Sequence, residues 1–213
     1  MYNNLIILGI DAAWTGTEPS GVAIAIEAKG GWRLAAVEAS YERFIARAEG
    51  KDPGEARPRG SMPDAAALLQ AAERLSEGPV ALIAVDMPLA PYPIAGRRCC
   101  DRAISSAFGA KWAATHSPSA TRPGKISDGL RAEFAALGYG VSTEKHARGL
   151  IEVYPHAALI QFMNAPRRLE YKAGKIAAYW PTLMPDERHA RLRAVWARIV
   201  EALERRSRAS PPP

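Results

Sequence analysis

The sequence predicts an α/β fold with a mixed central sheet, in which the first three strands are antiparallel and the later strands parallel, flanked by helices. Two observations support this. Three short apolar segments follow one another near the N-terminus, which is typical of an antiparallel meander. Apolar strand-like segments then alternate with stretches of helical periodicity, which is typical of parallel strands. We expect one domain over residues 1–206, a flexible loop near 49–63 and a disordered tail at 207–213.

The spacing of apolar residues and turn signals defines each expected element. The expected strands are 5–10, 21–26, 32–40, 80–85 and 150–153. The expected helices are 61–77, 155–163 and 186–206. Lys29 and Gly30 open a turn between the second and third strands, and Ser61 is the expected N-terminal cap of the first helix. The continuous apolar run at 80–85 predicts a strand that is buried on both faces.

Composition favours a cytoplasmic protein with a polyanionic partner. The chain is 48% hydrophobic and 23% charged, near the average for globular proteins, and its formal charge of +6 favours binding to nucleic acid without choosing DNA or RNA. Cys99 and Cys100 are adjacent and poorly placed for a disulfide, which favours a reducing compartment. No run of about 18 apolar residues is present, so we expect no membrane span.

Two aspartates follow apolar strands directly. Asp11 ends the first expected strand and Asp86 ends the fourth. Ligands gather beyond the carboxyl ends of parallel strands, so we expect the two side chains to meet in one crevice. Because neighbouring carboxylates repel each other unless a cation or a shared proton lies between them, the pair predicts a divalent metal site. Alternatively, each aspartate caps the turn that follows it.

Short motifs extend this pattern along the chain. They are GIDAAW at 9–14, AVDMPL at 84–89, GRRCCDR at 96–102, IEVYPH at 151–156 and YKAGK at 171–175. In this order and spacing they resemble a family of predicted RNase H-like nucleases that is classed as a conserved domain of unknown function. The resemblance covers roughly residues 5–175 and implies an RNase H-like fold.

The resemblance also implies a catalytic centre. Asp11, Asp86 and Glu152 are then the metal ligands for Mg²⁺ or Mn²⁺, and two such ions roughly 4 Å apart catalyse phosphodiester hydrolysis. Glu152 is alternatively an exposed strand acid. Asp101 is a fourth catalytic candidate, or it pairs with a neighbouring arginine on a helix surface.

One feature of the family is missing. Its members usually end in a helix with an Asp-x-x-Asp-Ala motif, which this chain lacks after Glu204. Three explanations stay open: the chain is shortened relative to its relatives, Asp186 and Glu187 take the place of the motif, or the metal site is incomplete.

Basic and aromatic residues near these acids are candidates for substrate binding. They are Trp14, Arg97, Arg98, Arg102, His116, Arg122 and Lys172. Arginines position phosphate through forked hydrogen bonds, although a basic stretch of helix is also often a solvated face. The segment 111–125 has no periodicity and is expected to be a substrate loop, in which His116 transfers a proton or is only solvated. Trp14 stacks on a base or packs at the rim of the core.

Three functions follow from these residues. The leading hypothesis is a metal-dependent nuclease. The second is an ATP-binding phosphotransferase of the actin and sugar-kinase type, because Gly9-Ile10-Asp11 with Thr15-Gly16-Thr17 faintly resembles its first phosphate loop; the Met87-Pro88 that follows Asp86 does not match its second loop. The third is a nucleic-acid-binding or protein-binding module that kept the fold and lost catalysis.

Overall fold

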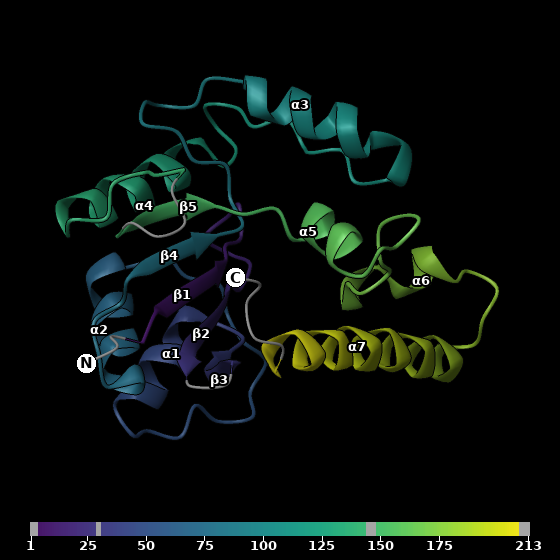
Figure 1. The fold of residues 1–213 in the computed structure, drawn as a ribbon, viewed down its shortest axis with the longest axis horizontal. Helices are drawn as coiled ribbons and strands as arrows, with labels where there is room; N and C mark the ends of the chain where they lie inside the picture. Colours follow the sequence, from purple (N-terminus) through teal and green to yellow (C-terminus); the bar gives the residue numbers. More distant parts are fainter. Residues whose placement is uncertain (1–3, 29–30, 144–147, 209–213) are drawn as a thin grey trace. The chain divides into compact units, whose positions relative to one another are not determined.

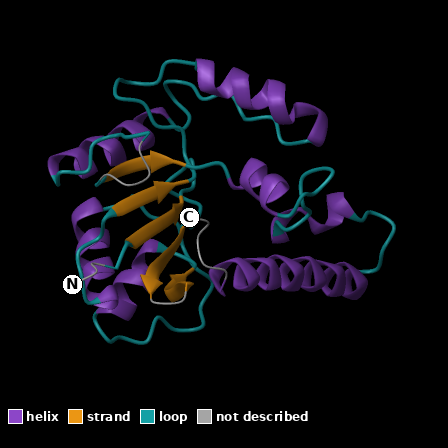
Figure 2. Ribbon diagram, viewed as in Figure 1, coloured by secondary structure: helices purple, strands orange, loops and turns teal. Residues whose placement is uncertain are grey.

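The computed structural model describes residues 4–28, 31–143 and 148–208, whose elements are labelled in Figure 1. The chain divides into two compact units. Unit 1 comprises Met1–Arg98 and Ser117–Tyr154, and unit 2 comprises Cys99–His116 and Pro155–Pro213. The strands belong to unit 1, whereas the described part of unit 2 is built from helices and loops (Figure 2). The prediction of one domain over residues 1–206 stays a prediction.

A five-stranded sheet forms the centre of unit 1, with the order β3-β2-β1-β4-β5. β1 pairs antiparallel with β2, and β2 with β3, whereas β4 runs parallel to both β1 and β5. The strands are β1 (Ile6–Asp11), β2 (Gly21–Ala28), β3 (Gly31–Glu38), β4 (Leu82–Val85) and β5 (Gly149–Glu152). The mixed α/β sheet that the sequence predicts, antiparallel first and then parallel, is therefore confirmed.

Alternation along the strands directs one face of the sheet into the core. In β1 the side chains of Ile6, Leu8 and Ile10 are buried, and the residues between them are less so. Helices α1 (Tyr41–Ala48) and α2 (Ala65–Ser76) contact the sheet, and α4 (Gly124–Ala136) contacts α2. This packing removes large apolar side chains from water, which is the main free-energy gain of folding.

Two helices of unit 1 were not expected from the sequence. α1 begins at a Ser40 cap, whose hydroxyl accepts a hydrogen bond from Arg43 N at 3.3 Å, so the predicted strand 32–40 ends earlier, at Glu38. α4 lies where no element was expected, and it buries Leu130 and Phe134. α1 is only eight residues long, and α4 contains glycine and has weak apolar periodicity, so tertiary packing decides whether they form.

The loop between α1 and α2 covers the whole segment 49–63 that was expected to be flexible, and it makes specific contacts. Arg43 donates to the Gly54 carbonyl oxygen at 2.7 Å and to that of Ala56. A Cβ at Gly60 would lie 2.5 Å from the Thr17 carbonyl oxygen, so this backbone passes directly against the loop that follows β1. The cap of α2 is Asp64, which accepts from Ala67 N at 2.9 Å, and the prediction of Ser61 as the cap is wrong.

Unit 2 is built from four helices and two 3₁₀ turns in its described residues. They are α3 (Cys99–Phe108), η1 (Gly109–Lys111), α5 (Pro155–Phe162), η2 (Ala173–Lys175), α6 (Ile176–Tyr179) and α7 (Pro185–Arg208). α6 packs against α7. On α7, Leu192 is buried, whereas Trp196 of the same apolar stripe is 43% exposed.

Some expectations lie outside the described residues. These are the turn residues Lys29 and Gly30 and the part of the expected tail at 209–213. The other part of that tail, 207–208, belongs to α7, which continues to Arg208. Within the described ranges, no helix combines the length and the hydrophobicity that a membrane crossing requires.

The close approach at Gly60 gives a stability prediction. We expect Gly60→Ala to lower the free energy of unfolding by about 1–3 kcal/mol, because its methyl group must displace the backbone of Thr17 and Glu18. Gly129→Ala is the matched control: it lies inside α4 with nothing within 4 Å and should stabilise the protein by up to about 1 kcal/mol. Urea unfolding measures both, and equal stability of the two variants would contradict the contact.

Candidate functional site

Asp11 and Asp86 lie side by side at the carboxyl edge of the sheet. Ile10 pairs with Val85 across β1 and β4, and Asp86 N donates to the Ile10 carbonyl oxygen at 2.8 Å. Asp11 follows Ile10 and Asp86 follows Val85. The Cα atoms of the two aspartates are therefore neighbours on adjacent strands, which are spaced about 5 Å apart. Asp11 is exposed and Asp86 is half-buried. The pairing therefore brings together the two acids that the sequence predicts.

Buried polar groups support the chain around Asp11. The hydroxyl of Ser20, which is 4% exposed, accepts from Ala13 N at 3.0 Å. Tyr41, the first residue of α1, lies beside this group. Burial raises the pKa of Tyr41, a hydrogen bond with Ser20 lowers it, and the charge of Asp11 raises it. Tyr41 therefore presents a neutral hydroxyl near Asp11 at physiological pH.

Glu152 pairs with Val85 and not with Asp86. Because side chains alternate along a strand, Glu152 lies on the face of the buried Val85, opposite to Asp11. Its Oε2 accepts from Leu89 N at 2.8 Å, and Arg98 binds both carboxylate oxygens, at 2.5 Å and 2.7 Å. The role of Glu152 as a metal ligand stays a prediction. The structure shows that Arg98 is its charged partner.

Arg98 is enclosed by the chain. Its side chain is 8% exposed, and besides Glu152 it donates to the Leu89 carbonyl oxygen at 2.7 Å. It precedes α3, so the alternative of a solvated helix face is wrong for this residue. The hydroxyl of the buried Ser127 on α4 donates to the Pro88 carbonyl oxygen. These contacts hold the segment that follows Asp86.

The other predicted residues of unit 1 have separate surroundings. Arg97 donates to the Ser117 hydroxyl at 2.8 Å, and Arg122 is exposed after a tight turn with Ser119. Trp14 is half-buried and packs against the core cluster, as the rim-packing alternative expects. Substrate binding by these residues stays a prediction.

The remaining candidates, Asp101, Arg102, His116 and Lys172, belong to unit 2. Asp101 is 3% exposed on α3, and its carbonyl oxygen accepts from the Thr115 hydroxyl at 3.0 Å. Arg102 is exposed on the same helix. The segment 111–125 begins at the last residue of η1 and enters α4 at Gly124, and its role as a substrate loop stays a prediction.

His116 and Lys172 come together around a residue that had no predicted role. His156, on α5, is 6% exposed. Burial, together with the nearby charges of Arg168, Lys172 and His116, lowers the pKa of His156 from 6.5 to about 3. The ring of Tyr171 lies 5.2 Å from that of His156. Unit 2 thus gathers positive charge around a neutral imidazole.

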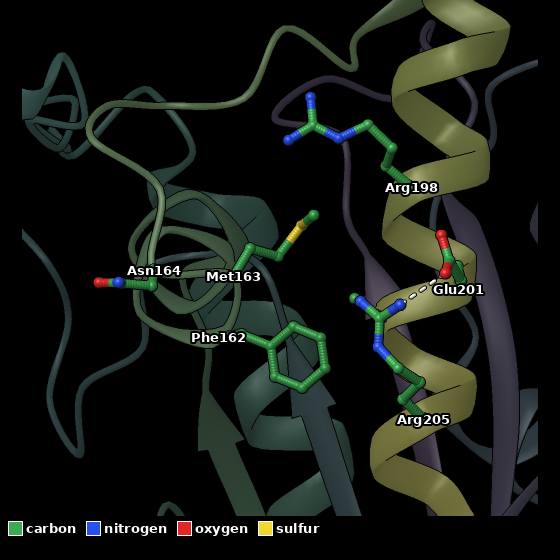
Figure 3. Close-up of a pocket in the computed structure, with 7 residues that line it drawn as sticks. Phe162, Met163, Asn164, Arg198, Glu201 and Arg205 are labelled. Atoms are coloured by element: carbon green, nitrogen blue, oxygen red, sulfur yellow. Dashed lines mark hydrogen bonds and ion pairs between the residues drawn. The ribbon is translucent and has the colours of Figure 1, made fainter.

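Unit 2 also contains two cavities that the sequence did not indicate. One, of about 460 Å³, is lined by Trp112, Arg167, Arg168, Glu170, Ala178 and Tyr179. The other, of about 520 Å³, is lined by residues at the end of α5 and on α7, among them Phe162, Met163 and Arg198 (Figure 3). Its Glu201 forms an ion pair with Arg205 at 2.6 Å. For the first of these cavities, the adjacent Arg167 and Arg168 were the one available signal in the sequence.

The acids of unit 1 suit one kind of metal site. Mg²⁺ and Mn²⁺ prefer oxygen ligands, and Mg²⁺ is commonly held by one or two carboxylates while water and substrate phosphate complete its shell. Asp11 and Asp86 are two carboxylates of this kind, and their role as metal ligands stays a prediction. Among the described residues no group of three or more His, Cys, Asp or Glu is arranged to hold a metal. Glu187, considered as a substitute acid, accepts from Met184 N at 2.9 Å at the start of α7.

A comparison with family models matches residues 9–212 to a family described as "Protein of unknown function (DUF429)". The chain belongs to the DUF429 family. No curated protein and no solved structure matches this DUF429 chain. The predicted membership in a domain-of-unknown-function family is therefore confirmed, and the match includes Asp11, Asp86 and Glu152.

The Arg98–Glu152 pair of this DUF429 protein predicts a metal-independent effect. In EDTA, we expect Glu152→Gln to lower the free energy of unfolding by about 1.5–3 kcal/mol, because it leaves an enclosed guanidinium with a weaker partner. The matched control is Glu201→Gln, in an ion pair whose side chains are both 66% exposed, which should change stability by less than about 1 kcal/mol. If Glu152→Gln instead stabilises the protein, the prediction is contradicted, because the Glu152 carboxylate would then act mainly through repulsion of other negative charges.

His156 predicts a pH dependence of stability. Its folded pKa of about 3 lies below the ordinary 6.5, so the unfolded state binds more protons between these values and stability falls as the pH is lowered. The contribution is complete above about pH 6.5. We expect His156→Gln to flatten the decline in melting temperature between pH 6.5 and 5, whereas the control His189→Gln on α7 should not. An unchanged slope in His156→Gln would contradict this assignment.

Proposed function

We propose that this DUF429 protein is a metal-dependent nuclease with an RNase H-like fold. The observation that carries the proposal is the position of Asp11 and Asp86, adjacent at the carboxyl ends of two parallel strands. Ligand sites of open sheets gather at such edges. The strand order β3-β2-β1-β4-β5, with its antiparallel and parallel pairs, supports the fold that the motif resemblance implies.

Asp11 and Asp86 are the residues that would hold Mg²⁺ or Mn²⁺. When bound, such an ion supplies an activated water for attack on a phosphodiester and charge to steady the leaving oxygen. A mechanism with two ions requires further ligands, for which Glu152 and Asp101 are the proposed candidates. DNA and RNA are both candidate substrates, because each offers the same phosphodiester.

The chain's own residues keep Asp11 and Asp86 in place. Ser20 holds the backbone after Asp11 through Ala13 N. Arg98 and Glu152 bind the two backbone groups of Leu89, three residues beyond Asp86. Glu152 is therefore proposed to act first as a positioning residue. Carboxylates placed in this way need little reorganisation when substrate phosphate arrives, which is the basis of electrostatic preorganisation.

A binding module without catalysis is the second candidate. It is favoured by the engagement of both Glu152 oxygens with Arg98, which competes with any metal for this carboxylate. A Mn²⁺ titration separates the two candidates. The nuclease should bind Mn²⁺ at a site that Asp11→Asn abolishes, and a module without catalysis should have no such site.

Nuclease activity provides the test. We expect the purified chain to cleave single-stranded or duplex DNA or RNA in Mg²⁺ or Mn²⁺ and not in EDTA. Asp11→Asn and Asp86→Asn should each reduce the rate about 100-fold or more, because each removes a charge from the centre. Asp52→Asn is the control: this exposed carboxylate accepts from Gly54 N at 2.9 Å, and the amide oxygen can still accept. Equal cleavage by Asp11→Asn and the control would refute the proposal.

A further inference from the structure

Trp112 occupies a backbone conformation that favours glycine. It follows η1 with φ 61° and ψ 26°, in the left-handed region, and its N–H donates to the Gly109 carbonyl oxygen at 2.9 Å. Helices commonly end with glycine in this conformation, because a Cβ there crowds the following carbonyl oxygen. The indole is nevertheless 62% exposed, so core packing does not explain a large aromatic residue here. Strained residues of this kind cluster at binding sites.

Cationic groups surround the exposed indole. The guanidinium of Arg167 lies 4.3 Å from the centre of the Trp112 ring, within the range of a cation–π contact. Arg168 N donates to the Lys111 carbonyl oxygen at 2.8 Å, next to Trp112, and its guanidinium lies 3.5 Å from the Tyr179 hydroxyl. These residues line the cavity of about 460 Å³, a volume typical of small-ligand sites.

The charge of this cavity is positive. Glu170 is its acidic residue, and one carboxylate oxygen lies 3.5 Å from the Arg167 guanidinium while the other accepts from Trp180 Nε1 at 3.2 Å. Arg168 also lies close enough to the buried His156 for its charge to act there, as do Lys172 and His116. Two arginines thus face one carboxylate that already has partners, with further basic groups nearby.

We propose that Trp112, Arg167 and Arg168 bind a nucleotide of a single-stranded nucleic acid, with the base stacked on the indole and the phosphate held by the guanidinium groups. Aromatic residues stack on bases of any sequence, and arginine matches the geometry of phosphate. A single strand presents the faces of its bases, whereas a duplex covers them. This site requires no metal, so the inference goes beyond the proposed nuclease activity.

Binding of fluorescein-labelled oligo(dT) in EDTA, measured by anisotropy, tests the site. Trp112→Ala should weaken binding roughly 10-fold, and Trp112→Phe, which keeps a ring, should retain most of the affinity. Trp32→Ala is the matched control: this tryptophan is 40% exposed on β3 of unit 1, and its variant should bind as the unmodified protein does. Trp112→Gly keeps the test valid if Trp112→Ala unfolds, because glycine accepts the backbone conformation while losing the ring.

The salt dependence separates stacking from charge. Arg168→Gln should reduce the slope of log affinity against log salt by about 0.7, the value for one phosphate contact on a single strand, and Trp112→Ala should leave the slope unchanged. Duplex DNA of the same length should bind without dependence on Trp112. Thymidine monophosphate in large excess should compete with oligo(dT) if the site takes one free nucleotide. If it does not compete, the site requires the strand context. Either result supports a nucleotide site, provided that Trp112→Ala binds oligo(dT) weakly.

Three outcomes would overturn the inference. They are no binding of oligo(dT) by the unmodified protein, equal binding by Trp112→Gly, and a loss of binding in Arg168→Gln alone, which would indicate a simple phosphate site. Cleavage is measured in Mg²⁺ or Mn²⁺, whereas oligo(dT) binding is measured in EDTA, where no metal-dependent step can occur. Failure of the nuclease proposal, detected by cleavage assays, is therefore distinguishable from failure of this one.

Discussion

The parallel pairing of β1 with β4 is the constraint on which the acidic site depends. Ile10 lies opposite Val85, and the hydrogen bond from Asp86 N to the Ile10 carbonyl oxygen extends the ladder beyond the end of β4. A slip of one residue would turn every side chain of a strand to the other face. Such a slip would expose Ile10 and bury Asp11. The free energy of the hydrophobic core therefore fixes where the two carboxylates lie.

The Arg98–Glu152 pair connects this edge to β5 and limits what Glu152 can do. A carboxylate with both oxygens on a guanidinium has fewer lone pairs left for a cation, and a divalent ion beside Arg98 is repelled by the positive charge. Removing one partner of an enclosed pair is costly, since the other charge stays without compensation. The geometry thus favours a positioning role for Glu152, through its contact with Leu89, over direct metal binding.

Most of the sheet could be predicted from the sequence because its signals are local. Continuous apolar runs ended by aspartate located β1 and β4, and their direction followed from the helix between them. α4 was missed because its stability comes from packing Leu130 and Phe134 on distant residues. The Arg98–Glu152 pair joins positions 54 residues apart, and the left-handed conformation of Trp112 depends on its place after η1. Neither leaves a local pattern.

The proposed nuclease would need both acidic groups for metal and basic groups for phosphate. Paired aspartates repel phosphate until a cation neutralises them, so Asp11 and Asp86 cannot by themselves supply affinity for a polyanion. Affinity for nucleic acid comes mainly from Lys and Arg near phosphates, and it weakens as salt rises. Unit 2 contains such groups in Arg167, Arg168 and Lys172. If both proposals hold, the basic groups bind substrate without metal, and metal is required only for cleavage.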